Sequence, residues 1–395
     1  MKVLMVNDND PDAVVGGSEH YIADLTHALE ADGHDVHWFA LSEDPARVAS
    51  GRSRKCVFRI RATTRWVAIR RRVIFFRDLH RELADYVARL RPDVIHLHNN
   101  HRYPVSVLAA ARGHRIVQTV HDYCAMYPTA NCSRRRSCAG RSVFVALGHG
   151  CLTWKLLATE FLLLYGRRFL DRRFVDAFIA PSRDLALHLD RMGYARVRHV
   201  PNFRLLPESG TTPLPDAQVV LYAGALIAHK GVAMLLDAFA GLVGDVPQAA
   251  LWLVGNGPDA ADLESSVRAR GLRGVRFLGQ RSPDELADLY RRARVVVIPS
   301  LWLENAPLVA IEAAAYGRAV IASRVGGLPE LVEHGKTGFL FDRGDRAGLA
   351  DRLRLLLTDR SLAETLGAAG REQSAKRLSP IRHLDRILAV YGASH

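Results

Sequence analysis

The chain has 395 residues, of which 49% are hydrophobic and 24% charged, as is ordinary for a globular protein. This length predicts two or three domains with substantial cores, and the composition excludes a disordered chain. The formal net charge is +13, and residues 1–203 hold most of the excess, with 31 basic against 20 acidic residues. A surface of this kind attracts anionic lipid or an acidic acceptor, or simply keeps the protein soluble.

Short segments rich in Val and Ile alternate with helical patterns along the whole chain, which predicts parallel sheets covered by helices on both faces. In the first half we expect strands near residues 2–6, 36–41, 56–60, 94–98, 116–121, 177–181 and 197–200. In the second half we expect them near residues 219–223, 250–254, 275–278, 295–299, 319–322 and 338–341. The intervening proline-rich stretch, 201–218, is typical of a linker. The prediction is an α/β protein with two doubly wound domains and ligands at the carboxyl ends of the strands, in the cleft between the domains.

Two glycines follow the first expected strand. Gly16 and Gly17 stand just before a helix that Ser18 could cap, so the backbone there can approach a phosphate or a sugar closely. A plain turn is the alternative. No G-x-G-x-x-G pattern is present, which argues against a dinucleotide cofactor. The apolar N-terminal stretch is too short for a signal peptide, so we expect a cytoplasmic protein.

Histidines occur near the ends of two expected strands. We expect His96 and His98 to point to opposite faces of their strand, with His98 the one that reaches the cleft. His121 closes the next strand. A histidine at a strand end is more often structural than functional, so position alone assigns none of them a role.

Four of the five cysteines fall within 28 residues, but they lack the close C-x2-C pairs of a strong zinc motif; they are Cys124, Cys132, Cys138 and Cys151. A zinc site, an oxidisable pair and free thiols are the alternatives, and free thiols are favoured. The longest apolar stretch, 156–166, contains Glu160 and falls short of the roughly 18 residues that a membrane span needs. It indicates an amphipathic or core helix.

The second half contains the segment PSLWLENAPLVAIE, residues 299–312, at the junction of an expected strand and helix. Glu304 lies on the loop before the helix, and Glu312 lies more than one turn into it. Backbone amides at a helix start face an anion, which predicts a phosphate site. Carboxylates beside a diphosphate are suited to accept hydrogen bonds from hydroxyls, Glu304 from a sugar and Glu312 from a ribose. A solvated loop acid and a helix-face acid are the alternative.

The E-x7-E spacing of Glu304 and Glu312, followed by AVIASRVGGLPELVEHGKTGFLFD at 319–342, resembles retaining glycosyltransferases of the GT-B fold, family 4 or group 1. Segments 221–239, 251–259 and 275–286 extend the resemblance to nearly the whole chain. It implies two Rossmann-like domains facing a deep cleft, and a C-terminal helix that returns to the first domain. The implied boundaries are 1–203 for the acceptor-side domain, 204–217 for a linker, 218–376 for the nucleotide-sugar domain and 377–395 for the returning helix.

The resemblance also implies site residues. His121, with Asp122 beside it, would lie next to the transferred sugar and act with Glu304 and Lys230 as the catalytic group. Donor contacts would come from Gly16, Gly17, Lys230, Asn305, Ala306, Pro307, Leu308, Val309 and Glu312, and base contacts from Gln280 and Arg281. One position departs from the family pattern, because Ala225 stands where an Arg usually binds the diphosphate. Lys230 must then carry more of the charge, or another Arg must reach in.

The expected activity is hexosyl transfer from a UDP- or GDP-sugar to an acceptor hydroxyl, with retention of anomeric configuration and without a metal or other cofactor. A leaving phosphate oxygen would take the acceptor proton, and Glu304 as a double-displacement nucleophile is the less favoured route. Expected acceptors are a lipid-linked saccharide, a polysaccharide or a small metabolite, with a peripheral contact to anionic membrane and no nucleic acid. The rivals are a donor-binding or partner subunit impaired by Ala225 and a sugar-nucleotide epimerase of the same fold.

Overall fold

The computed structural model describes residues 1–9, 16–42, 55–59, 75–98, 103–123, 166–206 and 213–392. These residues form two compact units, one of Met1–Pro201 with Ile381–His395 and the other of Asn202–Pro380. We call them unit 1 and unit 2 and describe each by itself.

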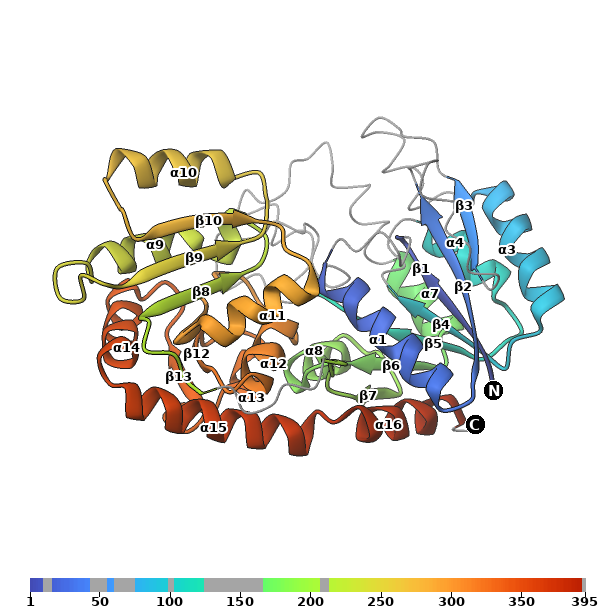
Figure 1. Ribbon diagram of the computed structural model, residues 1–395. Helices are drawn as coiled ribbons and strands as arrows, with labels where there is room; N and C mark the ends of the chain where they lie inside the picture. The colour runs from blue at the N-terminus through green and yellow to red at the C-terminus, as the bar shows by residue number, and fades with distance from the viewer. Residues whose placement is uncertain are drawn as a thin grey trace. The chain divides into compact units, whose positions relative to one another are not determined.

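Unit 1 is built on a parallel sheet that has seven strands within the described residues, in the order β3-β2-β1-β4-β5-β6-β7 (Figure 1). The strands are β1 (Lys2–Asn7), β2 (Asp35–Ser42), β3 (Lys55–Arg59), β4 (Val94–His98), β5 (Ile116–Thr119), β6 (Ala177–Ala180) and β7 (Val197–His199). The helices of this unit are α1 (Gly17–Ala31), α3 (Arg77–Leu90), α4 (Pro104–Ala110), α7 (Arg167–Phe174), α8 (Arg183–Arg191) and α16 (Pro380–Gly392). The strand order reverses between β1 and β4, so the carboxyl ends of these two strands form the switch point of the sheet.

Unit 2 is built on a second parallel sheet, with six strands in the order β10-β9-β8-β11-β12-β13 in the described part of the chain. The strands are β8 (Val219–Ala223), β9 (Ala250–Val254), β10 (Val275–Gly279), β11 (Val295–Ile298), β12 (Ala319–Ser323) and β13 (Gly338–Phe341). They alternate with the 3-10 helix η3 (Ala228–Lys230), α9 (Val232–Ala240), α10 (Ala260–Ala269), α11 (Pro283–Arg292), α12 (Leu308–Ala315), α13 (Leu328–Leu331), α14 (Arg346–Thr358) and α15 (Arg360–Arg377).

Strand β11 shows why these sequences form parallel sheets. Val295 and Val297 pack into a core with α9 and α14 on one face, while Val296 and Ile298 pack into a core with α11 and α12 on the other. A strand buried on both faces needs apolar residues at every position, and VVVI supplies them. All thirteen strands expected from the sequence are present to within a few residues, so the α/β fold class is confirmed.

The C-terminal helix α16 belongs to unit 1, as the resemblance implied. His383 Nε2 lies 3.1 Å from the Tyr21 hydroxyl of α1, and the Tyr391 hydroxyl lies 2.7 Å from His96 Nδ1 of β4. Arg115 donates to the Val390 carbonyl at 2.8 Å. Polar contacts therefore hold both ends of α16 on this unit.

Several residues that carried expectations lie outside the described ranges. These residues are Cys124, Cys132, Cys138 and Cys151, the apolar stretch before Gly166, and most of the arginines between 52 and 72 and at 134–136. Among the residues that the structure describes, no helix is both long and apolar enough to cross a membrane.

Candidate active site

The loops after β8 and β11 meet at the switch point of unit 2, where the strand order reverses. Gly231 has a φ of 75°, and a Cβ there would stand 1.9 Å from the Pro299 carbonyl oxygen, so only glycine allows this approach. Leu301 donates its backbone N–H to the His229 carbonyl at 2.8 Å. These contacts hold Lys230, at the end of η3, against the loop that carries Glu304.

Glu304 is 8% exposed and forms an ion pair with Lys230, whose Nζ lies 2.7 Å from Oε1. The Ser300 hydroxyl donates to the same oxygen. Burial alone would raise the pKa of Glu304, but Lys230, Ser300 and His229 together hold that pKa below its ordinary value. Glu304 is therefore an ionised acceptor at neutral pH.

The Glu304 loop is also fixed from its other side, by the turn after β12. Gly327 donates its N–H to the Glu304 carbonyl at 2.7 Å, and a Cβ at Gly326, where φ is 53°, would lie 2.1 Å from that carbonyl oxygen. Gly326 and Gly327 belong to the segment that resembles the family, and they pack directly on the backbone of Glu304, the first acid of the motif.

Helix α12 begins at Leu308, with Pro307 at the N-cap. The Pro307 side chain makes no hydrogen bond to the amides of the first turn among the residues that the structure describes. Just upstream, the Ala306 carbonyl accepts from Asn202 Nδ2 at 3.1 Å, and Asn305 is buried. The backbone amides of the first turn, which include those of Leu308 and Val309, are suited to an anion.

Glu312, in the second turn of α12, is held by two protein donors. Arg204 Nε donates to Oε1 at 2.9 Å, and the Tyr290 hydroxyl donates to Oε2 at 2.8 Å. The side chains of Arg204 and Glu312 are each 8% exposed. Sequence reasoning missed Arg204, because it lies in the stretch interpreted as a linker; its single signal was the expectation that another Arg might replace the one missing at Ala225.

Gln280 and Arg281 directly follow β10 and are exposed. Arg281 Nη1 lies 3.0 Å from Glu285 Oε1, and Ser282 and Glu285 form a capping box at the start of α11. The two residues are accessible at the carboxyl end of β10, an edge strand of the described sheet.

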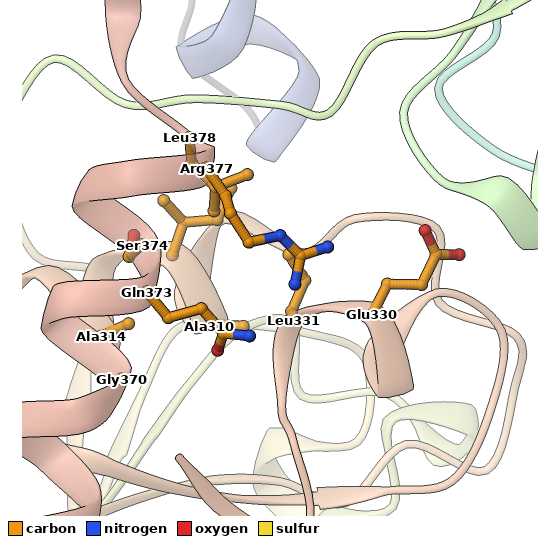
Figure 2. A pocket seen from close by; sticks show the side chains of 10 residues that line it. Ala310, Ala314, Glu330, Leu331, Gly370, Gln373, Ser374, Arg377 and Leu378 are labelled. Carbon is orange, nitrogen blue, oxygen red and sulfur yellow. The ribbon is translucent and has the colours of Figure 1, made fainter. Parts of the chain in front are cut away.

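A pocket lies between α12, α13 and α15, and Figure 2 shows Arg377 of α15 extending across it toward α13. Ala310 and Ala314 of α12 line this pocket. At 100° per residue, these positions and Glu312 lie on nearly opposite sides of the helix. The pocket is therefore separate from the surface formed by the two acids.

In unit 1, Gly16 is the N-cap of α1, which begins at Gly17. The expectation that Ser18 caps this helix is wrong, because Ser18 lies inside the first turn and its hydroxyl donates to Glu19 Oε2 at 2.9 Å. Glu19 is 3% exposed and also accepts from Asn9 Nδ2 at 2.9 Å. The Gly-Gly-x-Glu pattern contains this acid, but sequence reasoning assigned it no role.

The three histidines at or near the strand ends form one cluster, in which His96 and His98 are fully buried and His121 is half-buried. The expectation that His96 and His98 face opposite sides is wrong: residues two apart on a strand share a face, and their ring centroids lie 4.0 Å apart. His98 Nδ1 lies 3.0 Å from His121 Nε2. The ring of Tyr21 packs edge-on against that of His121, with 5.4 Å between the ring centroids. Burial lowers the pKa of His121 to about 4, although Asp122 and Glu19 act in the opposite direction. The ring is neutral at physiological pH.

Residues 15–204 match the family model "Glycosyltransferase Family 4", and residues 210–373 match "Glycosyl transferases group 1". Together the two matches cover most of the chain. The chain belongs to this family of glycosyltransferases, and its fold is GT-B.

Individual relatives agree with this assignment. A sulfoquinovosyl transferase of Arabidopsis thaliana is 36% identical over 165 residues, which are 41% of this chain and 31% of that protein. The chain thus matches about a third of that relative's length. The solved structure of sucrose-phosphate synthase from Thermosynechococcus elongatus is 25% identical, covers 99% of this chain and 98% of its own, and superposes with a TM-score of 0.76. HepE of Anabaena, in complex with UDP and glucose, is 19% identical, covers 98% of each chain and has a TM-score of 0.72.

Proposed function

We propose that this glycosyltransferase moves a hexose from a nucleotide-sugar to an acceptor hydroxyl, with retention of anomeric configuration and without a metal ion. The observation that carries the proposal is the 2.7 Å pair between Lys230 and Glu304 at the switch point of unit 2, directly before α12. Ligands of open α/β sheets bind at such points. A cation, a helix N-terminus and an ionised acceptor together match a diphosphate joined to a sugar.

The donor diphosphate binds to Lys230 and to the first-turn amides of α12. An ammonium group has three donors, so Lys230 can keep its bond to Glu304 while it contacts a phosphate oxygen. Asn305, Ala306 and Pro307 shape the approach to the amides of Leu308 and Val309. Ala225 contributes no charge, so the ammonium and the helix dipole supply the neutralisation that other sites obtain from a divalent ion.

The two acids bind hydroxyls. Both donors to Glu304 reach Oε1, which leaves Oε2 to accept from the transferred sugar. Glu312 receives one donor on each oxygen, and each carboxylate oxygen can accept a second hydrogen bond. Glu312 therefore accepts from a ribose hydroxyl while Arg204 and Tyr290 hold it in place.

The anomeric configuration is retained when the acceptor attacks the sugar on the same face from which the leaving group departs. A departing phosphate oxygen takes the acceptor proton on that face, so the protein needs no nucleophile. Lys230 stabilises the charge on the leaving diphosphate. Neutral His121 and the backbone near Gly16 and Gly17 position sugar hydroxyls and support the positive charge of the oxocarbenium-like transition state.

For the donor we favour UDP-glucose or a similar UDP-sugar over a GDP-sugar, since the HepE complex contains UDP and glucose. Gln280 and Arg281 are the proposed contacts to the base. The acceptor is a hydroxyl of a lipid-linked saccharide, a polysaccharide or a small metabolite. On α7, Phe169 is 67% exposed and precedes Arg172 and Arg173, a combination suited to a peripheral contact with anionic lipid at the inner face of the membrane.

Proton NMR of the product formed from an α-linked UDP-sugar in the presence of EDTA tests the proposal. We expect an α-linked product at an undiminished initial rate. A β-linked product contradicts retention, and activity that returns only with Mg²⁺ or Mn²⁺ contradicts metal independence. Slow inactivation reversed by Zn²⁺ alone would instead report a structural role for the four cysteines at 124–151.

A further inference from the structure

The contacts of His98 determine which of its nitrogens carries the hydrogen. His98 ends β4, is fully buried, and its Nε2 lies 3.4 Å from the Met5 sulfur of β1. A thioether has no hydrogen to donate and can only accept. A neutral imidazole at this position therefore has its hydrogen on Nε2, directed at Met5, and a lone pair on Nδ1.

This lone pair determines the tautomer of His121. His98 Nδ1 faces His121 Nε2 at 3.0 Å, so a hydrogen bond between them requires the hydrogen on His121 Nε2. A neutral imidazole has one ring hydrogen, and His121 Nδ1 is then an acceptor. The hydrogen-bond order runs from His121 through His98 to Met5.

We propose that His98 is a positioning residue for sugar transfer, which holds His121 as the Nε2–H tautomer so that its Nδ1 accepts a hydrogen bond from a substrate hydroxyl. The inference rests on the proposed function, since it gives His121 a place beside the sugar. His98 touches no substrate and acts through the neighbouring ring.

The packing around the pair supports a positioning role. The ring of His96 lies 4.0 Å from that of His98, and the edge of Tyr21 packs on both His98 and His121. His96 has separate partners, the Tyr391 and Thr119 hydroxyls, each at 2.7 Å. Because both ring nitrogens of His96 bond to these hydroxyls, His96 shares the core with His98 without bonding to His121, which makes it a matched control.

The test combines two-bond ¹H–¹⁵N spectra of the histidine rings with steady-state kinetics, in the full-length wild type and in His98→Asn, His98→Leu and His96→Leu. The His121 signals are assigned by their loss in His121→Gln. We expect Nε2–H in the wild type and in His98→Asn, whose amide oxygen can still accept. In His98→Leu we expect mixed tautomers and a kcat lowered about tenfold to a hundredfold, with little change in the donor KM.

His96→Leu separates positioning from core damage. We expect it to lower Tm as His98→Leu does but to leave the His121 tautomer and most of kcat unchanged. A wild-type His121 with its hydrogen on Nδ1, or equal kinetic losses in the two leucine variants, overturns the inference. A wild type that transfers no sugar, or inverts it, instead contradicts the proposed function, and the spectra remain readable in that case.

Discussion

The switch points of the two sheets place buried polar groups at equivalent positions but stabilise them in opposite ways. In unit 1, the ends of β4 and β5 carry neutral histidine rings that bond to one another and to hydroxyls. In unit 2, the loop after β11 and helix α12 carry two carboxylates, each paired with a cation. The difference shows that one topology supports a neutral and an ionic site, and that each is vulnerable to a different change.

Acid should produce the largest effect, and it should affect unit 1 first. Burial lowers the pKa of both His121 and His383 to about 4, below the ordinary value of 6.5. The unfolded chain therefore takes up protons before the folded unit does, so stability is complete above pH 6.5 and falls as pH drops toward 4. At roughly 1.4 kcal/mol per pKa unit, the two groups together amount to several kcal/mol.

Hydrogen exchange measured by mass spectrometry at pH 7 and pH 5, corrected for intrinsic exchange rates, checks this expectation. Peptides from β4, β5 and α16 should lose protection, while those from β11 and β12 keep theirs, since the low pKa of Glu304 preserves its charge at pH 5. Equal losses in both units would refute the contrast.

Removal of one charge should damage unit 2 instead. Arg204→Met leaves the buried carboxylate of Glu312 without its cation, which costs about 3–5 kcal/mol when a buried pair is broken. Arg204→Met combined with Glu312→Gln should recover much of the loss, because no unpaired charge remains. Urea denaturation of both variants measures the effect, and a single variant as stable as the wild type would show that solvent reaches the pair.

Loss of the Lys230 ammonium should affect turnover most. Lys230→Ala removes a charge-assisted donor to the leaving diphosphate, so we expect kcat to fall about 10²- to 10³-fold. Tm should fall as well, but less than in Arg204→Met, because the Lys230 side chain is 31% exposed and water can take its place beside the Glu304 carboxylate. UDP should bind more weakly while uridine binds as before. The control is Lys336→Ala, which breaks an exposed ion pair with Glu333 elsewhere on unit 2. Equal losses for UDP and uridine would make Lys230 a structural residue.

The smallest expected effect is a gain. Ala225 is exposed on the turn after β8, near Lys230 in sequence, and Ala225→Arg places a guanidinium where the resemblance implies one. A charge-assisted hydrogen bond to phosphate contributes about 1.5–3 kcal/mol, and the ordering of a long side chain offsets part of it. Calorimetry should show UDP bound about tenfold more tightly. Unchanged affinity would mean that the cationic character of this site is already sufficient.

Helix α16 shows how residues from the two ends of the chain combine in unit 1. Its His383 and Tyr391 reach residues of α1 and β4 more than 290 positions away. The resemblance implied that the helix returns to the first domain, and this was confirmed. It did not imply that the contact is made through histidines and tyrosines, which makes the attachment of the helix part of the acid-sensitive cluster.

Local patterns in the sequence determined the strands and the order of their alternation with helices. Apolar runs such as VVVI at 295–298, and the eight-residue step from Glu304 to Glu312, need only one segment of chain to be recognised. The positions of Glu304 on a loop and Glu312 on a helix were predicted correctly for this reason. Even so, the faces of His96 and His98 were predicted wrongly, although the two-residue period of a strand was sufficient to place them together.

Only the tertiary structure decided which partners these residues have. Arg204 and Glu312 are 108 positions apart and meet because the segment after β7 enters unit 2 beside α11 and α12. His98 and His121 meet because β4 and β5 are neighbours in the sheet, and Met5 joins them because β1 lies on the other side of β4. Strand order and the crossings of the chain bring such residues together, and no pattern in the residues themselves records which distant side chain will satisfy a buried nitrogen or carboxylate.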